Sequence, residues 1–275
     1  MTEARAPDTF AERCGPWAIV AGASEGIGAS FARQIAGRGI HLVLVARRPE
    51  PLEQLASEIR HEHGVAVRTA TLDLTGDGVL GALTDITDDV EIGLLVYNAG
   101  ATHGASAFHD DPVERSLGLV RLNCVGPVAL THHFGRLMAV RGRGGIVLMT
   151  SVSAVAGAAL TVAYSATKAF DQVLAEGLWA ELRPHGVDVL ALVAGATRTP
   201  AMERSGALIG SAEFPGMDPD EVASEGLTHL GDGPTWVAGE ENRAAFDFLR
   251  GLPRADAVGL MSAGARAIYG LDDKA

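Results

Sequence analysis

Two side chains with acid–base chemistry, Tyr164 and Lys168, stand four residues apart in the sequence. Residues at this spacing share one face of a helix, so the phenol and the ammonium can converge on one point. A cation held beside a phenol favours the phenolate, which makes a tyrosine usable as a general acid or base near neutral pH. Ser151 lies thirteen residues before Tyr164. The pair alone is weak evidence, because tyrosine and lysine at this spacing occur on many solvated helices.

A glycine-rich turn near the N-terminus supplies a second, independent signal. Gly22, Gly26 and Gly28 follow a predicted strand and open a predicted helix. Such a turn lets backbone N–H groups and the helix N-terminus approach a pyrophosphate, and Ser24 and Ile27 inside it are expected cofactor contacts. The alternative is a strand-to-helix turn with no ligand, which the flanking strand and helix make the minor interpretation. Together with the tyrosine–lysine pair, the turn predicts hydride transfer with a dinucleotide.

The end of the second predicted strand indicates which dinucleotide. A site for NAD usually places an acid there to bind the ribose hydroxyls. This sequence has Ala46, followed by Arg47 and Arg48. A guanidinium pair suits a 2′-phosphate by charge and by bidentate geometry. The sequence therefore favours NADP(H) over NAD(H), although an arginine pair at a strand end is also commonly just solvated and Glu25 adds negative charge nearby.

After the third predicted strand, Asp73 and Leu74 are expected near the adenine. The carboxylate of Asp73 has two interpretations, because it can bind the adenine amino group or cap the turn that follows.

Short apolar runs alternate along the chain with longer segments of helical period. This pattern is typical of a parallel sheet built from βαβ units. Strands are predicted over residues 17–21, 41–45, 66–71, 92–97, 145–150 and 187–193, and near 235–238; helices are predicted over 27–38, 51–63, 113–141 and 163–184. We expect one domain over residues 1–275, with a core at about 17–199.

The remaining residues are expected to form a lid and a C-terminal part. Gly206, Gly210 and Gly216 stand among apolar residues, which predicts a mobile segment over about 200–218 that closes over a substrate. Asp218 followed by Pro219 is a good helix start. Residues of about 219–275 should form a last strand and helices.

Composition and charge exclude several classes of function. The net charge of -12 disfavours nucleic acid, whose binding needs clustered Lys and Arg. Apolar runs fall short of the ~18 residues of a membrane span, and residues 1–16 lack a signal peptide's apolar stretch. The two cysteines, Cys14 and Cys124, are expected to be reduced. We therefore expect a cytoplasmic protein, and the spacing of the histidines predicts no metal site.

In sequence order, the glycine turn, Asn98-Ala99-Gly100, Asn123, Ser151, Tyr164 and Lys168 closely resemble the short-chain dehydrogenase/reductase family. The resemblance covers about residues 17–199. It implies a Rossmann-type α/β fold, that is, a doubly wound parallel sheet holding cofactor and substrate in one domain. It also implies a homodimer or homotetramer.

The resemblance carries roles onto matching positions. Tyr164 would protonate the carbonyl oxygen while hydride arrives, and Lys168 would favour the ionised phenol and bind the nicotinamide ribose. Ser151 would polarise the carbonyl, and Asn123 would hold a water of the proton relay. The Asn98–Ala99–Gly100 segment would line the adenosine ribose.

The chain departs from the family pattern in two places. The usual Pro-Gly after the sixth strand is replaced by Ala194-Gly195, although Thr197 and Thr199 still match positions that meet the nicotinamide carboxamide and the phosphates. The ending typical of fatty-acid-synthesis ketoreductases is absent. The tail instead resembles the branch that holds the 17β-hydroxysteroid and long-chain ketoacyl reductases.

The substrate is predicted to be a bulky, mainly apolar ketone, with reduction the physiological direction. The segment 152–163 carries no charge. The segment after Thr199 adds Met202, Leu208, Ile209, Phe214 and Met217. Pockets that bury most of a ligand are lined mainly by such side chains. Packing against the core or a neighbouring subunit would explain the same residues.

Two alternatives belong to other classes of protein. A non-catalytic NADP-binding sensor or scaffold would not need the set of Asn123, Ser151, Tyr164 and Lys168. A sugar-nucleotide epimerase or dehydratase usually needs a larger C-terminal substrate domain than the residues after Thr199 can form.

Overall fold

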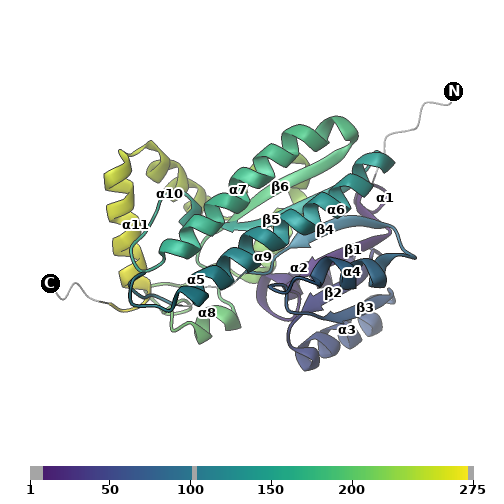
Figure 1. The fold of residues 1–275 in the computed structure, drawn as a ribbon, viewed down its shortest axis with the longest axis horizontal. Helices are drawn as coiled ribbons and strands as arrows, with labels where there is room; N and C mark the ends of the chain where they lie inside the picture. Colours follow the sequence, from purple (N-terminus) through teal and green to yellow (C-terminus); the bar gives the residue numbers. More distant parts are fainter. Residues whose placement is uncertain (1–8, 101–103, 272–275) are drawn as a thin grey trace.

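The structure is a computed structural model that describes residues 9–100 and 104–271, and it contains a seven-stranded, wholly parallel sheet (Figure 1). The strand order is β3-β2-β1-β4-β5-β6-β7. The strands are β1 (Trp17–Ala21), β2 (His41–Ala46), β3 (Val67–Thr71), β4 (Ile92–Tyr97), β5 (Gly144–Ser151), β6 (Val187–Ala194) and β7 (Thr235–Val237). The predicted doubly wound sheet is confirmed, and each predicted strand agrees within one residue at either end.

Helices connect the strands and extend beyond the last one. They are α1 (Phe10–Cys14), α2 (Gly26–Ala36), α3 (Pro49–His63), α4 (Val79–Thr87), α5 (Val113–Val120), α6 (Gly126–Arg141), α7 (Val162–Leu182), α8 (Pro200–Arg204), α9 (Pro219–Thr228), α10 (Glu240–Gly251) and α11 (Arg254–Ile268). The expected start of α9 is present, since the Asp218 side chain accepts a hydrogen bond from the backbone N–H of Asp220 at 2.9 Å. The short helix α8 lies at the start of the segment 200–218, for which the sequence predicted a mobile lid and no helix.

One predicted helix, 113–141, is interrupted by a π-helical turn (Arg121–Val125) between α5 and α6. The hydroxyl of Tyr97 donates a hydrogen bond to the carbonyl of Leu122 at 2.6 Å. A Cβ at Gly126 would lie 2.1 Å from that hydroxyl, so the tyrosine presses directly on the helix. Pro127 has no N–H to offer the carbonyl four residues earlier. A side chain that takes over a helix carbonyl, next to a proline, explains the change of pitch.

The sheet is covered on both faces. Phe31 and Ile35 of α2 pack on one face with Leu227 of α9, while Phe134 of α6 and Ala175 of α7 pack on the other. Strands buried on both sides must be apolar throughout rather than alternating. All strands run the same way, so their carboxyl ends meet at one edge of the sheet, the edge where α/β proteins place their ligands.

The C-terminal helices lie at one end of the molecule, opposite to α3 (Figure 1). The backbone N–H of Leu208 donates to the carbonyl of Ile268 at 2.8 Å, and that of Ala159 donates to the Ser262 hydroxyl at 2.9 Å. The tail thus folds back onto the segments that follow β5 and β6. Within the described residues, no helix is long and apolar enough to cross a membrane.

Candidate active site

The turn between β1 and α2 has a backbone shape that favours glycine. Gly22 and Gly26 have φ angles of +82° and +55°, in the left-handed region. Gly28 is needed for space, because a Cβ there would lie 2.0 Å from the Gly22 carbonyl oxygen. Asn98, directly after β4, donates its side-chain N–H to that same carbonyl at 2.9 Å. The turn is therefore a compact cradle at the N-terminus of α2, and its shape fits a pyrophosphate.

A cavity of about 1030 Å³ lies at the carboxyl edge of the sheet. Most of the residues predicted to bind or react line it: Gly22, Ser24, Gly26, Ile27, Arg47, Arg48, Leu74, Asn98, Ala99, Gly100, Ser151, Tyr164, Lys168, Thr197 and Thr199. Gly28, Asp73 and Asn123 are not on its wall. The volume is at the upper end of the range for ligand pockets, as a site for both a dinucleotide and a second molecule requires.

The reactive side chains come from β5 and α7. Ser151 ends β5, and its hydroxyl accepts a hydrogen bond from the backbone N–H of Ser153 at 3.2 Å. Tyr164 lies in the first turn of α7, and Lys168 follows one turn later. Lys168 is only 4% exposed, and its Nζ donates to the carbonyl of Met149 at 2.8 Å. The cation is thus fixed at the floor of the cavity, on the side of α7 that carries the phenol.

Asn123 lies at the centre of the π-helical turn and is fully buried. Its side-chain N–H donates to the Thr167 hydroxyl at 2.9 Å, which in turn donates to the carbonyl of Tyr164 at 2.8 Å. A methyl group at Gly100 would lie 3.2 Å from Lys168 Nζ and 3.7 Å from Asn123 Oδ1. Asn123 therefore sits behind the cavity wall, beside the lysine. Single π-turns inside α-helices are frequent at functional sites.

The two arginines after β2 are in different electrostatic situations. Arg48 forms an ion pair with Glu25, and Arg204 of α8 forms another with the same carboxylate. Burial of Glu25 disfavours its charged form, but the hydrogen bonds from Arg204 and Arg48 outweigh this and hold its pKa below the usual value. Arg47 is exposed on the cavity wall, and within the described residues it forms no ion pair. Glu25, expected to weaken a phosphate site, is instead neutralised by two cations.

The structure gives Asp73 the role of a turn cap. Its carboxylate accepts hydrogen bonds from the backbone N–H and the hydroxyl of Thr75, at 3.0 Å and 2.8 Å. These two bonds hold the pKa of Asp73 below its usual value. Leu74, the next residue, is the one on the cavity wall.

The two threonines after β6 shape the loop above the glycine cradle. Thr199 caps α8 by accepting from the N–H of Met202 at 3.3 Å, and its methyl group lies 2.9 Å from where a Cβ of Gly26 would be. Thr197 donates to the carbonyl of Gly195 at 3.1 Å and pairs with Met217 in an isolated parallel bridge. This bridge ties the far end of the 200–218 segment to the cofactor side.

The apolar part of the cavity differs in detail from the predicted one. Met202 and Ile209 line it, but Leu208, Phe214 and Met217 do not. Val152 and Ala158 of the segment before α7 also face it, whereas Val155 and Ala156 pack into a small core with β7 and α10. The rest of this part of the cavity wall comes from α11 and the residue after it: Leu260, Met261, Gly264, Ala265, Ile268 and Tyr269. The helical period of residues 219–275 predicted helices there, but it could not show that one of them lines the cavity.

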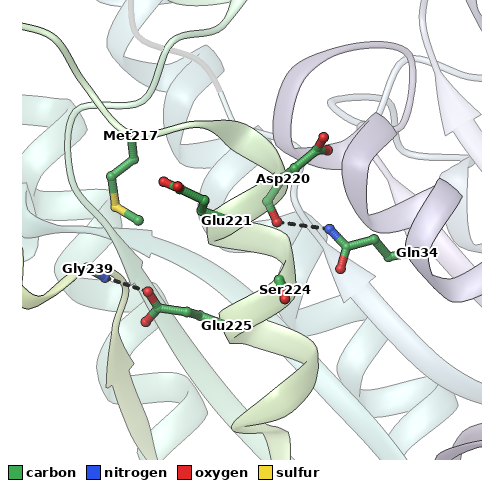
Figure 2. Close-up of a pocket in the computed structure, with 7 residues that line it drawn as sticks. All are labelled: Gln34, Met217, Asp220, Glu221, Ser224, Glu225 and Gly239. Atoms are coloured by element: carbon green, nitrogen blue, oxygen red, sulfur yellow. Dashed lines mark hydrogen bonds between the residues drawn. The ribbon is translucent and has the colours of Figure 1, made fainter.

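A second, shallow pocket of about 670 Å³ lies between α2, α9 and β7 (Figure 2). Glu225 and Gln34 are held there by Gly239 N–H and the Asp220 carbonyl, at 3.0 Å and 2.9 Å. Met217, predicted for the substrate site, lines this pocket, but none of the predicted catalytic or cofactor residues does, and its carboxylates have the wrong sign for a phosphate. Its hydrogen bonds tie α9 to α2 and to the residues after β7. Within the described residues, no group of three His, Cys, Asp or Glu is placed to hold a metal ion.

Comparison with known proteins gives a family match over most of the chain. Residues 16–207 match the family model described as short chain dehydrogenase. The 7beta-hydroxysteroid dehydrogenase of Clostridium sardiniense is 32% identical over 90% of this chain and 95% of its own length. The very-long-chain 3-oxoacyl-CoA reductase of Aspergillus clavatus is 35% identical over 72% of this chain but 59% of its own length.

Solved structures support the same family assignment. A 7beta-hydroxysteroid dehydrogenase studied for its stereoselectivity superposes with a TM-score of 0.85 at 28% identity, covering 92% of this chain and 98% of the other. A short-chain dehydrogenase from Sphingobium yanoikuyae in complex with NADPH gives a TM-score of 0.76 at 34% identity, covering 90% and 95%. The predicted resemblance to the hydroxysteroid and ketoacyl reductase branch is confirmed.

Proposed function

The chain belongs to the short-chain dehydrogenase family and is an oxidoreductase of that family, and from this premise we propose that it uses NADP(H) to reduce a bulky, mainly apolar ketone. The observation that carries the proposal is that Ser151, Tyr164 and Lys168 border the same cavity as the glycine cradle. A reducible carbonyl and a dinucleotide can therefore meet beside a proton donor.

NADP(H) is favoured by the charges around the cradle. Arg47 is exposed at the cavity wall without an ion pair in the described part of the chain, which suits a 2′-phosphate. Arg48 is engaged by Glu25 and contributes less. The relative that was solved with NADPH supports this assignment.

When bound in the glycine cradle, NADPH would supply the hydride that reduces the carbonyl carbon. Tyr164 donates its phenolic proton to the carbonyl oxygen, and the Ser151 hydroxyl donates a hydrogen bond to the same oxygen as negative charge develops there. Lys168, buried and charged, stabilises the phenolate left behind. Asn123 lies beside the lysine and behind the wall, where it can order the path by which the phenol regains a proton.

A bulky apolar substrate is favoured by the apolar side chains that line the same cavity as Tyr164. Met202, Ile209, Met261 and Ile268 contribute apolar surface from α8, the 200–218 segment and α11. Sites that bury most of a ligand are built from such side chains with few polar groups. The names of the relatives, which refer to steroids and very long acyl chains, agree with this choice.

The test is NADPH oxidation against three groups of carbonyl compounds: steroid-sized ketones, long-chain 3-oxoacyl thioesters and small charged keto acids. We expect the highest kcat/KM for one of the first two groups. Higher values for the keto acids would exclude the apolar site. Equal or tighter binding of NADH than NADPH in a direct titration would exclude the cofactor assignment. Tight NADPH binding without turnover on any ketone would favour the sensor or scaffold alternative.

A further inference from the structure

A buried carboxylate, Asp171, lies directly behind the catalytic lysine. Its Oδ2 accepts a hydrogen bond from Lys168 Nζ at 3.1 Å, one turn further along α7. Asp171 is 2% exposed, and it is not part of any motif described in the sequence analysis. Surface ion pairs at this spacing contribute little, but a pair removed from water is held in one geometry.

The other oxygen of this carboxylate is buried and, in the part of the chain that the structure describes, unpaired. Asp171 Oδ1 is buried and, within the described residues, has no hydrogen-bond partner, and the same is true of Asn123 Oδ1. Leaving a buried acceptor unpaired costs free energy, so such atoms are rare in proteins and call for an explanation. A carboxylate placed there for packing alone would be worse than an apolar residue of the same size.

The electrostatic surroundings of Asp171 come from three elements. Lys168 faces it from α7, Cys124 from the π-helical turn and Tyr97 from β4. Burial raises the pKa of Asp171 to about 6, against the lowering effect of Lys168. Burial also raises the pKa values of Cys124 and Tyr97, so neither is charged near neutral pH. Lys168 and Asp171 are thus the two charges of this buried group.

We propose that Asp171 is a positioning residue for the proposed reaction: its carboxylate fixes the Lys168 ammonium against the Met149 carbonyl and offsets part of the positive charge that Tyr164 experiences. The inference rests on the proposed function of Tyr164 and Lys168. Asp171 lies seven positions after Tyr164 on α7, about 10 Å along the helix axis. A unit charge at that distance inside a protein shifts an ionisation by about half a pH unit to one unit.

Two substitutions separate charge from position. Asp171→Asn keeps an oxygen that can accept from Lys168 but removes the charge, whereas Asp171→Ala removes both. The readout is kcat for alcohol oxidation against pH, at saturating NADP⁺ and substrate, because this direction needs the phenolate. In Asp171→Asn, we expect the rising limb to move to lower pH by about half a unit to one unit, with an unchanged plateau. In Asp171→Ala, we expect the plateau to fall about tenfold as well, because the ammonium is no longer fixed.

Asp188→Asn is the matched control. Asp188 is also a partly buried carboxylate with a raised pKa, but it lies at the start of β6, pairs with Arg13 of α1 and does not line the cavity. Its variant should leave the pH profile in place. Superposable profiles for wild type and Asp171→Asn, a shift toward higher pH, or equal plateaus for the two Asp171 variants would overturn the proposal. A lowered melting temperature alone would indicate a purely structural role.

The interaction between Lys168 and Asp171 can also be measured from the free energy of unfolding, without any enzymatic assay. This measurement tests the present inference separately from the proposed function. Asp171→Asn, Lys168→Gln and the double variant are compared by denaturant unfolding at about pH 8 and about pH 5. We expect effects that are non-additive at the higher pH and closer to additive at the lower one, where Asp171 takes up a proton. Additive effects at both values would overturn the role of Asp171 whether or not the protein turns over. Wild-type protein with no ketone reduction but clear coupling would instead refute only the proposed function.

Discussion

The phenol of Tyr164 is the group on which the proposed chemistry depends most directly. Replacing it by Phe removes the transferable proton and leaves the ring, the cavity and the helix unchanged. We expect Tyr164→Phe to lower kcat by about 10²- to 10⁴-fold, with NADPH affinity close to that of wild type. Lys168→Ala should damage both, because the lysine is assigned to the phenol and the ribose. Steady-state kinetics and NADPH fluorescence titration give the two quantities, and a Tyr164→Phe variant with near wild-type kcat would refute the mechanism.

Cofactor choice is also decided at single residues. Arg47→Asp should shift preference from NADPH toward NADH, since a carboxylate at that position repels a 2′-phosphate and can bind ribose hydroxyls. Arg48→Asp should shift it less, because Arg48 is already paired with Glu25. The ratio of kcat/KM for the two cofactors measures the effect. A larger shift for Arg48→Asp would show that the second arginine is the phosphate ligand.

The pKa of Asp171 makes a separate prediction about stability. Burial raises it to about 6 in the folded protein, from about 4 in an unfolded chain. Between these values the folded state binds more protons than the unfolded one, so acidification favours folding at this residue. Relative to Asp171→Asn, the wild type should therefore gain free energy of unfolding as pH falls from about 7 to about 4. Urea unfolding at several pH values measures the difference, and a constant difference would contradict the shift.

At the scale of elements, the substrate wall depends on α11. Ala265 lines the cavity, while Ala263, two residues earlier, is exposed and does not. Ala265→Trp should raise KM for a steroid-sized ketone about tenfold, the order expected for filling part of an apolar site, and affect a small ketone less. Ala263→Trp is the control and should change neither. Equal effects on both substrates would mean that α11 does not border the bound ketone.

The 200–218 segment, which we propose as a lid, is held at both sides by backbone hydrogen bonds. One side is bonded to α11 through Leu208 and Ile268, and the other is bridged to the cofactor loop through Met217 and Thr197. Opening it would require these backbone bonds to break, so a closing step would be a rearrangement of bonded segments and not the free motion that its glycines imply.

Sequence patterns predicted the elements whose signal is local. Strands buried on both faces are runs of Val, Ile and Leu, and the glycine turn and the Tyr164–Lys168 pair are defined by spacing. The π-helical turn was missed because it arises from Tyr97, a residue on a distant strand, although Pro127 inside a predicted helix was a usable signal. Asp171 and the two arginines on Glu25 were missed because partner choice depends on folding, not on sequence distance.

For the whole molecule, we expect self-association through helices. Val113, Leu117 and Val120 of α5, Val128 of α6 and Val173 of α7 are exposed apolar side chains on neighbouring helices. Exposed apolar side chains gathered on helices that contact one another favour an interface, and a second copy meeting them about a two-fold axis would bury the same side chains from both sides.

The corresponding test is Val128→Glu combined with Val173→Glu, with light scattering as the readout. We expect the assembly to dissociate, since burying two carboxylates per copy is costly. Val258→Glu is the control, because Val258 is an exposed apolar residue on α11, away from this surface. A monomeric wild type, or an unchanged mass in the double variant, would contradict the expected interface.

The carboxylate of Glu25 joins parts of the molecule that serve different ligands. It belongs to the turn that would hold the pyrophosphate, yet it binds Arg204 on the segment that borders the substrate. A dinucleotide that alters this contact changes the free energy of the substrate side, and linkage requires the substrate to alter dinucleotide affinity by the same factor. Cofactor and ketone should therefore bind cooperatively, each changing the affinity for the other by the same factor.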